Sequence, residues 1–301
     1  MNDELLEHGL IGLANTSARY PGSWFMGHKG AAVLAAHFLC HSIPLDEDVL
    51  DAVTEFAQAI IREDEPLFTP APAHPGTYPN GITPVVTKVE EVITQLTADG
   101  HDIIFASLAL KALIARPDLA TEPVVAGLVQ LLNDAQRDDP RRYLGYDDYL
   151  NMPVDYSTVP EFESPHAAAM YALTLHNTVY PDQVIDGHAY FLAGNKLHDV
   201  THAHALVELD NLGYHEIASS GIDALRKQFH LCATSRIPEG LAPFKAPYPL
   251  NPWQLAFWER DKTDAHQVKL AYSVMSLLAS AESAEREAVL TPISTYWHLL
   301  P

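Results

Sequence analysis

His266 and Lys269 are the first pair of side chains in this sequence that suggest chemistry. They follow Thr263 and Asp264, residue types that favour a helix start, so we predict that a helix begins at Thr263. Residues three apart share one face of a helix, and this face lies beside an apolar stripe over 268–275. A lysine in an apolar interior is costly unless it is paired, neutral or coordinated. The pair therefore predicts an interior site.

Two further histidines occupy matching places in the sequence. His28 follows Gly27 and His101 follows Gly100, and each stands in the first turn of a helical pattern that is apolar nearly all round. Such patterns predict inner helices with neighbours on most sides. Histidine is the commonest metal ligand, so the two are candidate ligands, with bonding to backbone or water as the alternative.

A histidine-rich segment over 197–206 offers three more candidates, His198, His202 and His204. The first two are four residues apart and would share a helical face, a spacing that suits two ligands of one metal. If the helix begins nearer Val200, His198 lies in the preceding loop instead. The alternative is the polar rim of an amphipathic helix. His198-Asp199 and His101-Asp102 also match the short His-Asp doublet of metal phosphohydrolases.

Composition limits the classes of function. The chain has 301 residues, of which 48% are hydrophobic and 19% charged, and its net charge of −21 disfavours binding to nucleic acid or to anionic membrane surfaces. Two distant cysteines, Cys40 and Cys232, form no motif and are expected to be free thiols in a reducing compartment. The acidic N-terminus does not resemble a signal peptide, and no apolar run is long enough to span a membrane, so we expect a cytoplasmic protein.

Helical periodicity dominates the chain and predicts an all-α, single-domain helical array over residues 1–301. Three long Pro-rich or irregular stretches interrupt it, over 65–84, 138–163 and 237–252. The Gly-His pairs at 27, 100 and 187 form a weak internal repeat. An α/α toroid of helix pairs is one fold that would explain this repeat. We also expect helices over 187–195 and, without a break, over 214–232.

Several common catalytic motifs are absent from the sequence. It contains no Gly-x-Ser-x-Gly elbow, no Gly-x-Gly-x-x-Gly fingerprint and no phosphate-binding Gly-Lys-Ser/Thr loop. Asp147 and Asp148 are reminiscent of the acidic Mg²⁺ sites of α-helical terpene cyclases, but their polar surroundings favour a solvated loop. Aromatic residues in the irregular stretches are candidates for the mouth of an apolar pocket, with loop packing as the alternative: Tyr78, Tyr146, Tyr149, Trp253 and Trp258.

Four of these segments, in order, resemble motifs of the questin oxidase-like family. They are the residues 27–34, 100–104, 197–206 and 264–269, which are similar to that family's Asn-His-Gly, His-Gly-Leu-Ile, His-x-Val-Thr-x-x-His-Ala-Leu and Asp-x-His-x-x-Lys segments. Together they span nearly the whole chain. Lys29 and Asp102 stand where the family has glycine, and His202 is an additional histidine.

The resemblance implies an oxidoreductase that cleaves an aromatic polyketide, such as an anthraquinone, with O₂ in a Baeyer–Villiger-like reaction. It implies a mononuclear non-haem iron, with Zn²⁺ as the alternative metal, held by a histidine set and a carboxylated Lys269. Carried over by position, the histidine ligands are His28, His101, His198 and His266. His204 or His202 would lie behind the ligands or act as a general base. Asp264 would orient His266, although its place at the helix start explains it equally well.

The residue types agree with this implication but leave two other functions open. Imidazoles bind Fe, Zn, Cu or Ni, and a lysine carbamate offers the carboxylate oxygens that a free ammonium lacks. With zinc, the same histidines would suit a hydrolase. A helical-repeat binding protein without chemistry is the third hypothesis. The expected partners of the oxygenase are an aromatic small molecule and O₂, without nucleic acid or membrane.

Overall fold

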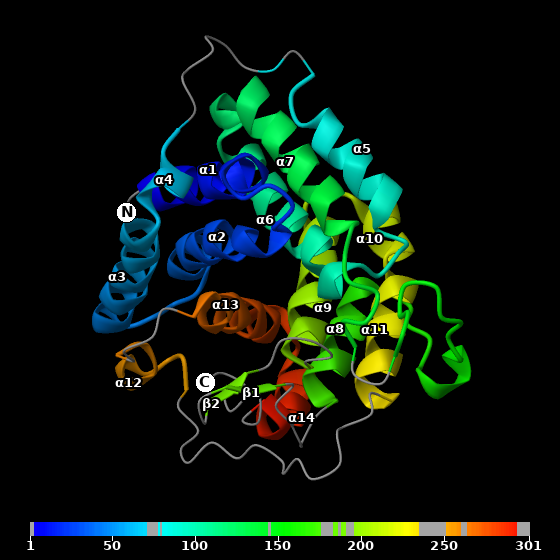
Figure 1. Cartoon of the computed structure of the whole chain (residues 1–301). Coiled ribbons are helices and arrows are strands. Elements are labelled where there is room, and N and C mark those ends of the chain that lie inside the picture. Colours follow the sequence, from blue (N-terminus) through cyan, green and yellow to red (C-terminus); the bar gives the residue numbers. More distant parts are fainter. Residues whose placement is uncertain are drawn as a thin grey trace.

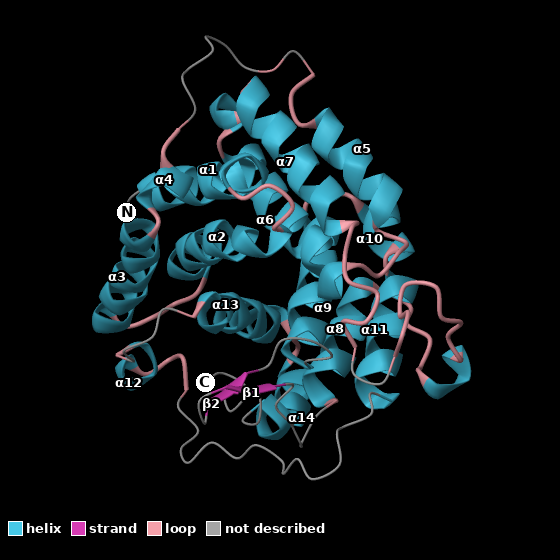
Figure 2. Cartoon of the chain, in the orientation of Figure 1, coloured by secondary structure: helices cyan, strands magenta, loops and turns pink. Residues whose placement is uncertain are grey.

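The computed structural model describes residues 3–70, 78, 80–143, 146–175, 183–185, 188–190, 196–234, 251–259 and 264–293. Helices account for nearly all of the regular structure in these ranges (Figure 2). Two strands of three residues, β1 (Gln183–Ile185) and β2 (His188–Tyr190), form one antiparallel pair. The predicted all-α fold class is confirmed, whereas the toroid of helix pairs stays a prediction.

Some of the helices follow one another directly, and others are separated by long stretches of chain. In chain order they are α1 (Glu4–Arg19), α2 (Gly27–Ser42), α3 (Glu47–Glu63), α4 (Glu65–Phe68), α5 (Thr83–Val92), α6 (His101–Ala115), α7 (Glu122–Ala135), α8 (Pro165–Thr174), α9 (Lys196–Asn211), α10 (His215–Ser220), α11 (Ile222–Thr234), α12 (Leu255–Trp258), α13 (Ala265–Ser280) and α14 (Ser283–Ile293).

Four helices, α2, α6, α9 and α13, form the centre of the molecule. α2 lies between α1 and α13, and α9 packs against both α6 and α13 (Figure 1). For α2 and α6, the patterns that are apolar nearly all round predict this central place, since a helix with no polar face must be covered on most sides. In α2, the residues from Ala31 to Ala36 have no exposed surface. The interior of the fold is therefore built from the same helices that carry the candidate histidines.

Glycines allow α1 and α2 to pack closely. A Cβ atom on Gly30 would lie 2.8 Å from the carbonyl carbon of Gly12 and 2.9 Å from the oxygen of Gly9, so backbone would have to move. We expect Gly30→Ala to lower the free energy of unfolding by about 3 kcal/mol, measured by urea denaturation. Gly213→Ala is the control, because that site is open and only its φ of +91° opposes a side chain, at a cost of about 1 kcal/mol. Equal losses would contradict the steric explanation.

Three local predictions need correction or fall outside the described residues. The prediction of a helix over 187–195 is wrong for the residues of this segment that the structure describes, because His188–Tyr190 forms β2. The helix expected over 214–232 is divided at Gly221, where a Cβ would come within 2.8 Å of side chains of Leu206 and Ile93. Thr263 lies outside the described residues, and Asp264 is the N-cap of α13.

Both cysteines are free thiols, as predicted. Among the described helices, none combines the length and the apolar character that a bilayer crossing requires.

Candidate metal centre

Four histidines from four different helices meet in the interior. His28 of α2, His101 of α6, His198 of α9 and His266 of α13 each place one ring nitrogen within 4.8 Å of the others. We call this set the histidine cluster. Ligand nitrogens about 2 Å from a shared ion lie about 3–4 Å apart, so small side-chain movements would bring this set around one metal. The sequence-predicted histidine set is therefore brought together by the fold.

Hydrogen bonds orient three of the four rings in the same way. His28 Nδ1 donates to Phe25 O at 2.7 Å, and His101 Nδ1 donates to Ala98 O at 2.5 Å. His266 Nδ1 lies 2.9 Å from Asp264 Oδ1, which also accepts the backbone N–H of His266. A ring that donates through Nδ1 keeps a lone pair on Nε2, the form that binds a metal. Asp264 thus both caps α13 and orients His266.

The glycine before each of two histidines has a packing reason. Gly100 has a φ of +79°, and a Cβ there would lie 2.5 Å from the His202 ring. A Cβ on Gly27 would lie 2.9 Å from the Phe105 ring. A larger residue at either place would displace the first turn that holds the histidine, so these Gly-His pairs follow from how the cluster is packed.

Burial keeps the cluster neutral. It lowers the pKa of His28, His101 and His198 well below the ordinary value, and the neighbouring cationic groups lower it further. The pKa of His266 is also lowered by burial, against the opposing effect of Asp264. A metal binds the neutral imidazole, so protons do not compete for these nitrogens at neutral pH. The Nε2 atoms of His28 and His101 are buried without a hydrogen-bond partner among the described residues, as expected for nitrogens that bind a metal.

Lys269 lies one helical turn after His266 and is 3% exposed. Burial lowers the pKa of its amine to about 7, although Asp264 opposes this shift. Its Nζ lies 6.0 Å from the centre of the Phe105 ring, and no carboxylate in the described part of the chain forms an ion pair with it. A substantial fraction of this amine is therefore neutral near pH 7, the form that reacts with CO₂.

A cavity of about 10 Å³ borders Lys269 on the side of α9, with room for about one water. His204 lines it, and its Nε2 lies 3.5 Å from Glu208 Oε1. Lys111 also binds Glu208, at 2.5 Å, and its side chain is 25% exposed. The sequence pattern did not reveal this polar group, because Lys111 and Glu208 are 97 residues apart.

His202 does not join the histidine cluster. Its Nδ1 lies 2.7 Å from Gln228 Oε1, and the ring packs against Gly100. The interpretation of His198 and His202 as two ligands of one metal is therefore wrong, although both lie on α9 and both are buried. The aspartates of the two His-Asp doublets do not belong to the cluster either, although His101 and His198 do. Asp102 accepts hydrogen bonds from Thr97 and Gln136, while Asp199 accepts one from Cys232.

The predicted aromatic pocket mouth is only partly described. Tyr149 is fully buried and its hydroxyl donates to Asp138, while Trp258 is buried and donates to Pro252 O, so neither lines a mouth. All of 71–77 and all of 237–250 lie outside the described residues. Asp147 and Asp148 are exposed, as expected for a solvated loop.

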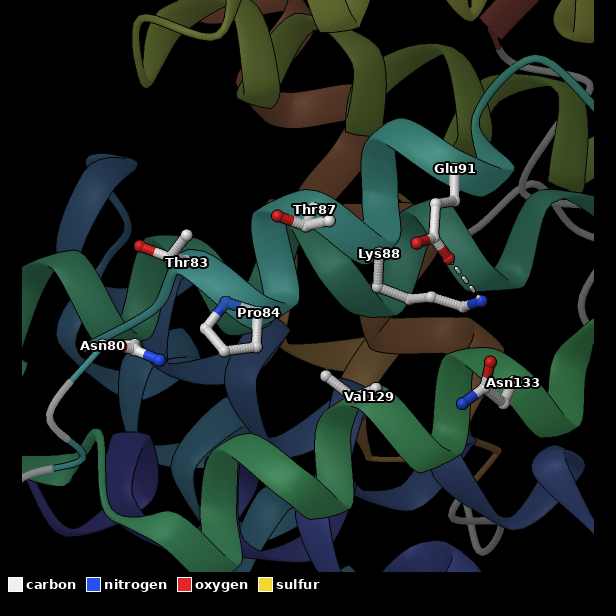
Figure 3. Close-up of a pocket in the computed structure, with 8 residues that line it drawn as sticks. All are labelled: Asn80, Thr83, Pro84, Thr87, Lys88, Glu91, Val129 and Asn133. Carbon is white, nitrogen blue, oxygen red and sulfur yellow. Dashed lines mark hydrogen bonds and ion pairs between the residues drawn. The ribbon is translucent and has the colours of Figure 1, made fainter.

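A separate groove of about 450 Å³ lies between α5 and α7 (Figure 3). Its rim carries Lys88, which pairs with Glu91 at 2.9 Å, and Asn133 lies on the facing helix. None of its lining residues belongs to the histidine cluster. The groove therefore does not lead to the candidate metal centre.

Comparison of the chain with protein-family models, with curated proteins and with solved structures finds no match. The motif resemblance to questin oxidase-like proteins therefore stays a prediction. The case for a function depends on the geometry of the cluster and its surroundings.

Proposed function

We propose that this protein is an iron-dependent oxygenase that oxidises or cleaves an aromatic, polyketide-like small molecule with O₂. The observation that carries the proposal is the convergence of four imidazoles, three of them buried and that of His266 partly buried, beside a buried lysine whose amine has a pKa of about 7. His28, His101, His198 and His266 would hold the metal, with Lys269 as a carbamate. When bound, iron would supply redox chemistry with O₂.

Lys269 would become a ligand only after carboxylation. Its neutral amine attacks the carbon of CO₂, a C–N bond forms, and the proton of the amine passes to solvent, leaving a carbamate anion. The lowered pKa favours this reaction, since a protonated amine has no lone pair. Such a carbamate adds one negative charge to an otherwise neutral ligand set, which favours binding of a divalent ion.

An aromatic surface next to the cluster supports an aromatic substrate. Phe25 is 44% exposed, and its ring centre lies 4.3 Å from that of His28. Trp24, which is buried, lies 5.2 Å from the ring of His101. Flat aromatic molecules gain from stacking on such rings, so the side of the cluster at Phe25 is where we place the approach of the substrate.

The first test is the metal content of protein purified without chelators or a histidine tag. We expect about one iron per chain in the wild type, and its loss in His266→Ala without unfolding, measured by elemental analysis and circular dichroism. His166→Ala is the matched control, because His166 pairs with Glu285 at 3.4 Å, away from the cluster, and should keep the metal. Iron retention would then justify measuring O₂ consumption with anthraquinone-type substrates.

Two other outcomes would replace the proposal. Stoichiometric zinc would favour a metal-dependent hydrolase on the same histidines, because four imidazoles also suit that ion. Absence of metal from the wild type and from both variants would favour a helical binding protein without metal chemistry.

A further inference from the structure

His198 is the one member of the histidine cluster whose ring no hydrogen bond orients. Neither of its nitrogens has a hydrogen-bond partner among the described residues, although the ring is 2% exposed. The other three rings each bond through Nδ1 to a backbone oxygen or a carboxylate. A histidine ligand normally has such a partner, because the bond selects the tautomer and fixes the ring. His198 therefore lacks a component that a metal site requires.

The nearest carboxylate to His198 belongs to Asp99. Its Oδ2 lies 4.0 Å from His198 Nδ1, beyond hydrogen-bonding distance but within reach of a small side-chain movement. Asp99 is 1% exposed, and neither of its carboxylate oxygens has a hydrogen-bond partner in the ranges that the structure describes. A donor and an acceptor that both lack a hydrogen bond thus lie 4.0 Å apart, although Asp99 Oδ2 also faces Arg142 at 3.6 Å. Buried polar atoms are rarely left in this state without a functional reason.

The backbone around Asp99 is held in an unfavourable conformation. Ala98, Asp99 and Gly100 have φ angles of 49°, 55° and 79°, and only the last residue is glycine. Consecutive left-handed residues with side chains are strained, and such strain concentrates at functional sites. The turn orients the cluster directly, since Ala98 O accepts the Nδ1–H of His101. The same strained turn therefore presents acceptors to two neighbouring cluster histidines.

Other residues hold this turn in place without satisfying the Asp99 carboxylate. The N–H of Ala98 donates to Asp138 Oδ2 at 3.1 Å, and Asp99 O accepts from Gln228 at 3.1 Å. Arg142 binds Asp138 through two nitrogens but comes only within 3.6 Å of Asp99. The backbone of Asp99 is thus fixed, while its carboxylate oxygens can still accept hydrogen bonds. That capacity is available to His198.

We propose that Asp99 is the positioning residue of His198: its carboxylate accepts the Nδ1–H of His198 when the cluster holds a metal, and so fixes Nε2 toward the ion. A bound cation withdraws electron density from the imidazole and makes its N–H a stronger donor, which closes the gap. This inference depends on the metal site of the proposed function. It adds a residue that neither the motifs nor their spacing singled out.

The test is Co²⁺ binding to metal-free protein, measured by titration of the visible absorption bands, beside thermal unfolding without metal. We expect Asp99→Asn to weaken Co²⁺ binding by about 10–100-fold and to shift the bands, because the amide can present its NH₂ group to His198. The melting temperature without metal should not fall, since the substitution removes a buried carboxylate that lacks hydrogen bonds. Asp99→Gly should weaken Co²⁺ binding similarly and fold at least as well, because it relieves the φ of 55°.

Asp102→Asn is the matched control. Asp102 is also fully buried at the start of α6, but its carboxylate accepts hydrogen bonds from Thr97 and Gln136. We expect this variant to melt at a lower temperature and to bind Co²⁺ as the wild type does. Wild-type affinity and spectrum in Asp99→Asn and Asp99→Gly would overturn the inference, as would a loss of affinity that only follows a loss of folding. Failure of the wild type to bind Co²⁺ would overturn the metal site itself.

Discussion

Lys269→Met is expected to make the metal-free protein more stable and the metal-loaded protein harder to form. Burial lowers the pKa of Lys269 from 10.5 to about 7. At pH 7 this shift lowers the free energy of unfolding by about 4 kcal/mol. Methionine has a similar length and no charge to desolvate, and it removes that cost. The free energy of unfolding, measured in urea at pH 7 without metal, should rise by about 3–4 kcal/mol.

The size of the Lys269 effect depends on pH. Because the folded pKa is lower than the unfolded one, the cost is fully present below pH 7 and disappears as the pH rises toward 10.5. The stabilisation by Lys269→Met should therefore shrink between pH 7 and pH 10. Iron affinity should fall about 100-fold or more, since the variant has no amine to carboxylate.

Lys29→Met is the control for both measurements. Lys29 lies on α2 beside His28, but its Nζ pairs with Asp64 at 3.1 Å and its side chain is 22% exposed. Its removal should lower the free energy of unfolding by about 1 kcal/mol and leave iron affinity unchanged. Equal effects of the two substitutions on affinity would count against Lys269 as a ligand. A destabilised Lys269→Met protein would show that the buried amine has a partner that offsets its desolvation.

The sequence predicts the inner helices and the candidate histidines well, for a physical reason. The patterns that begin at His28 and His101 have no polar face, so they require burial on most sides, and these two histidines are buried with the apolar residues around them. The spacing of His266 and Lys269 on one helix similarly places both beside the core. Periodicity therefore locates residues on helix faces and identifies which of these faces are buried.

Other features of the site depend on tertiary structure that periodicity does not contain. Asp99 acquires its position from two non-glycine residues with positive φ, a conformation that their residue types disfavour. His202 faces Gln228, which lies 26 residues further along the chain, so its spacing from His198 gave a misleading indication. The β2 strand replaces a predicted helix in a segment where the expected helical pattern was short.

The metal-free protein is expected to lose stability steeply as the pH falls from 6.5 to 4. Burial lowers the pKa of both His37 and His202 to about 4, and that of His28, His101 and His198 falls well below 6.5. Their folded pKa values lie below the unfolded value, so the unfolded chain takes up protons first and stability is lost as the pH falls through this window. His37 and His202 alone imply a loss of about 2 kcal/mol per pH unit between pH 6 and pH 4.5.

His202 is not one of the proposed ligands, so His202→Gln measures how much the protonation of this one histidine contributes to the loss of stability in acid. The slope of the unfolding free energy between pH 6 and pH 4.5, measured by urea titration of metal-free protein, should become shallower by about 1 kcal/mol per pH unit. His215→Gln is the control, since its side chain is 72% exposed, and the slope should not change. An unchanged slope in His202→Gln would mean that His202 takes up its proton in the folded protein. Bound metal should resist this acid unfolding until protons displace it from the imidazoles, so acid-induced metal release and unfolding should occur together.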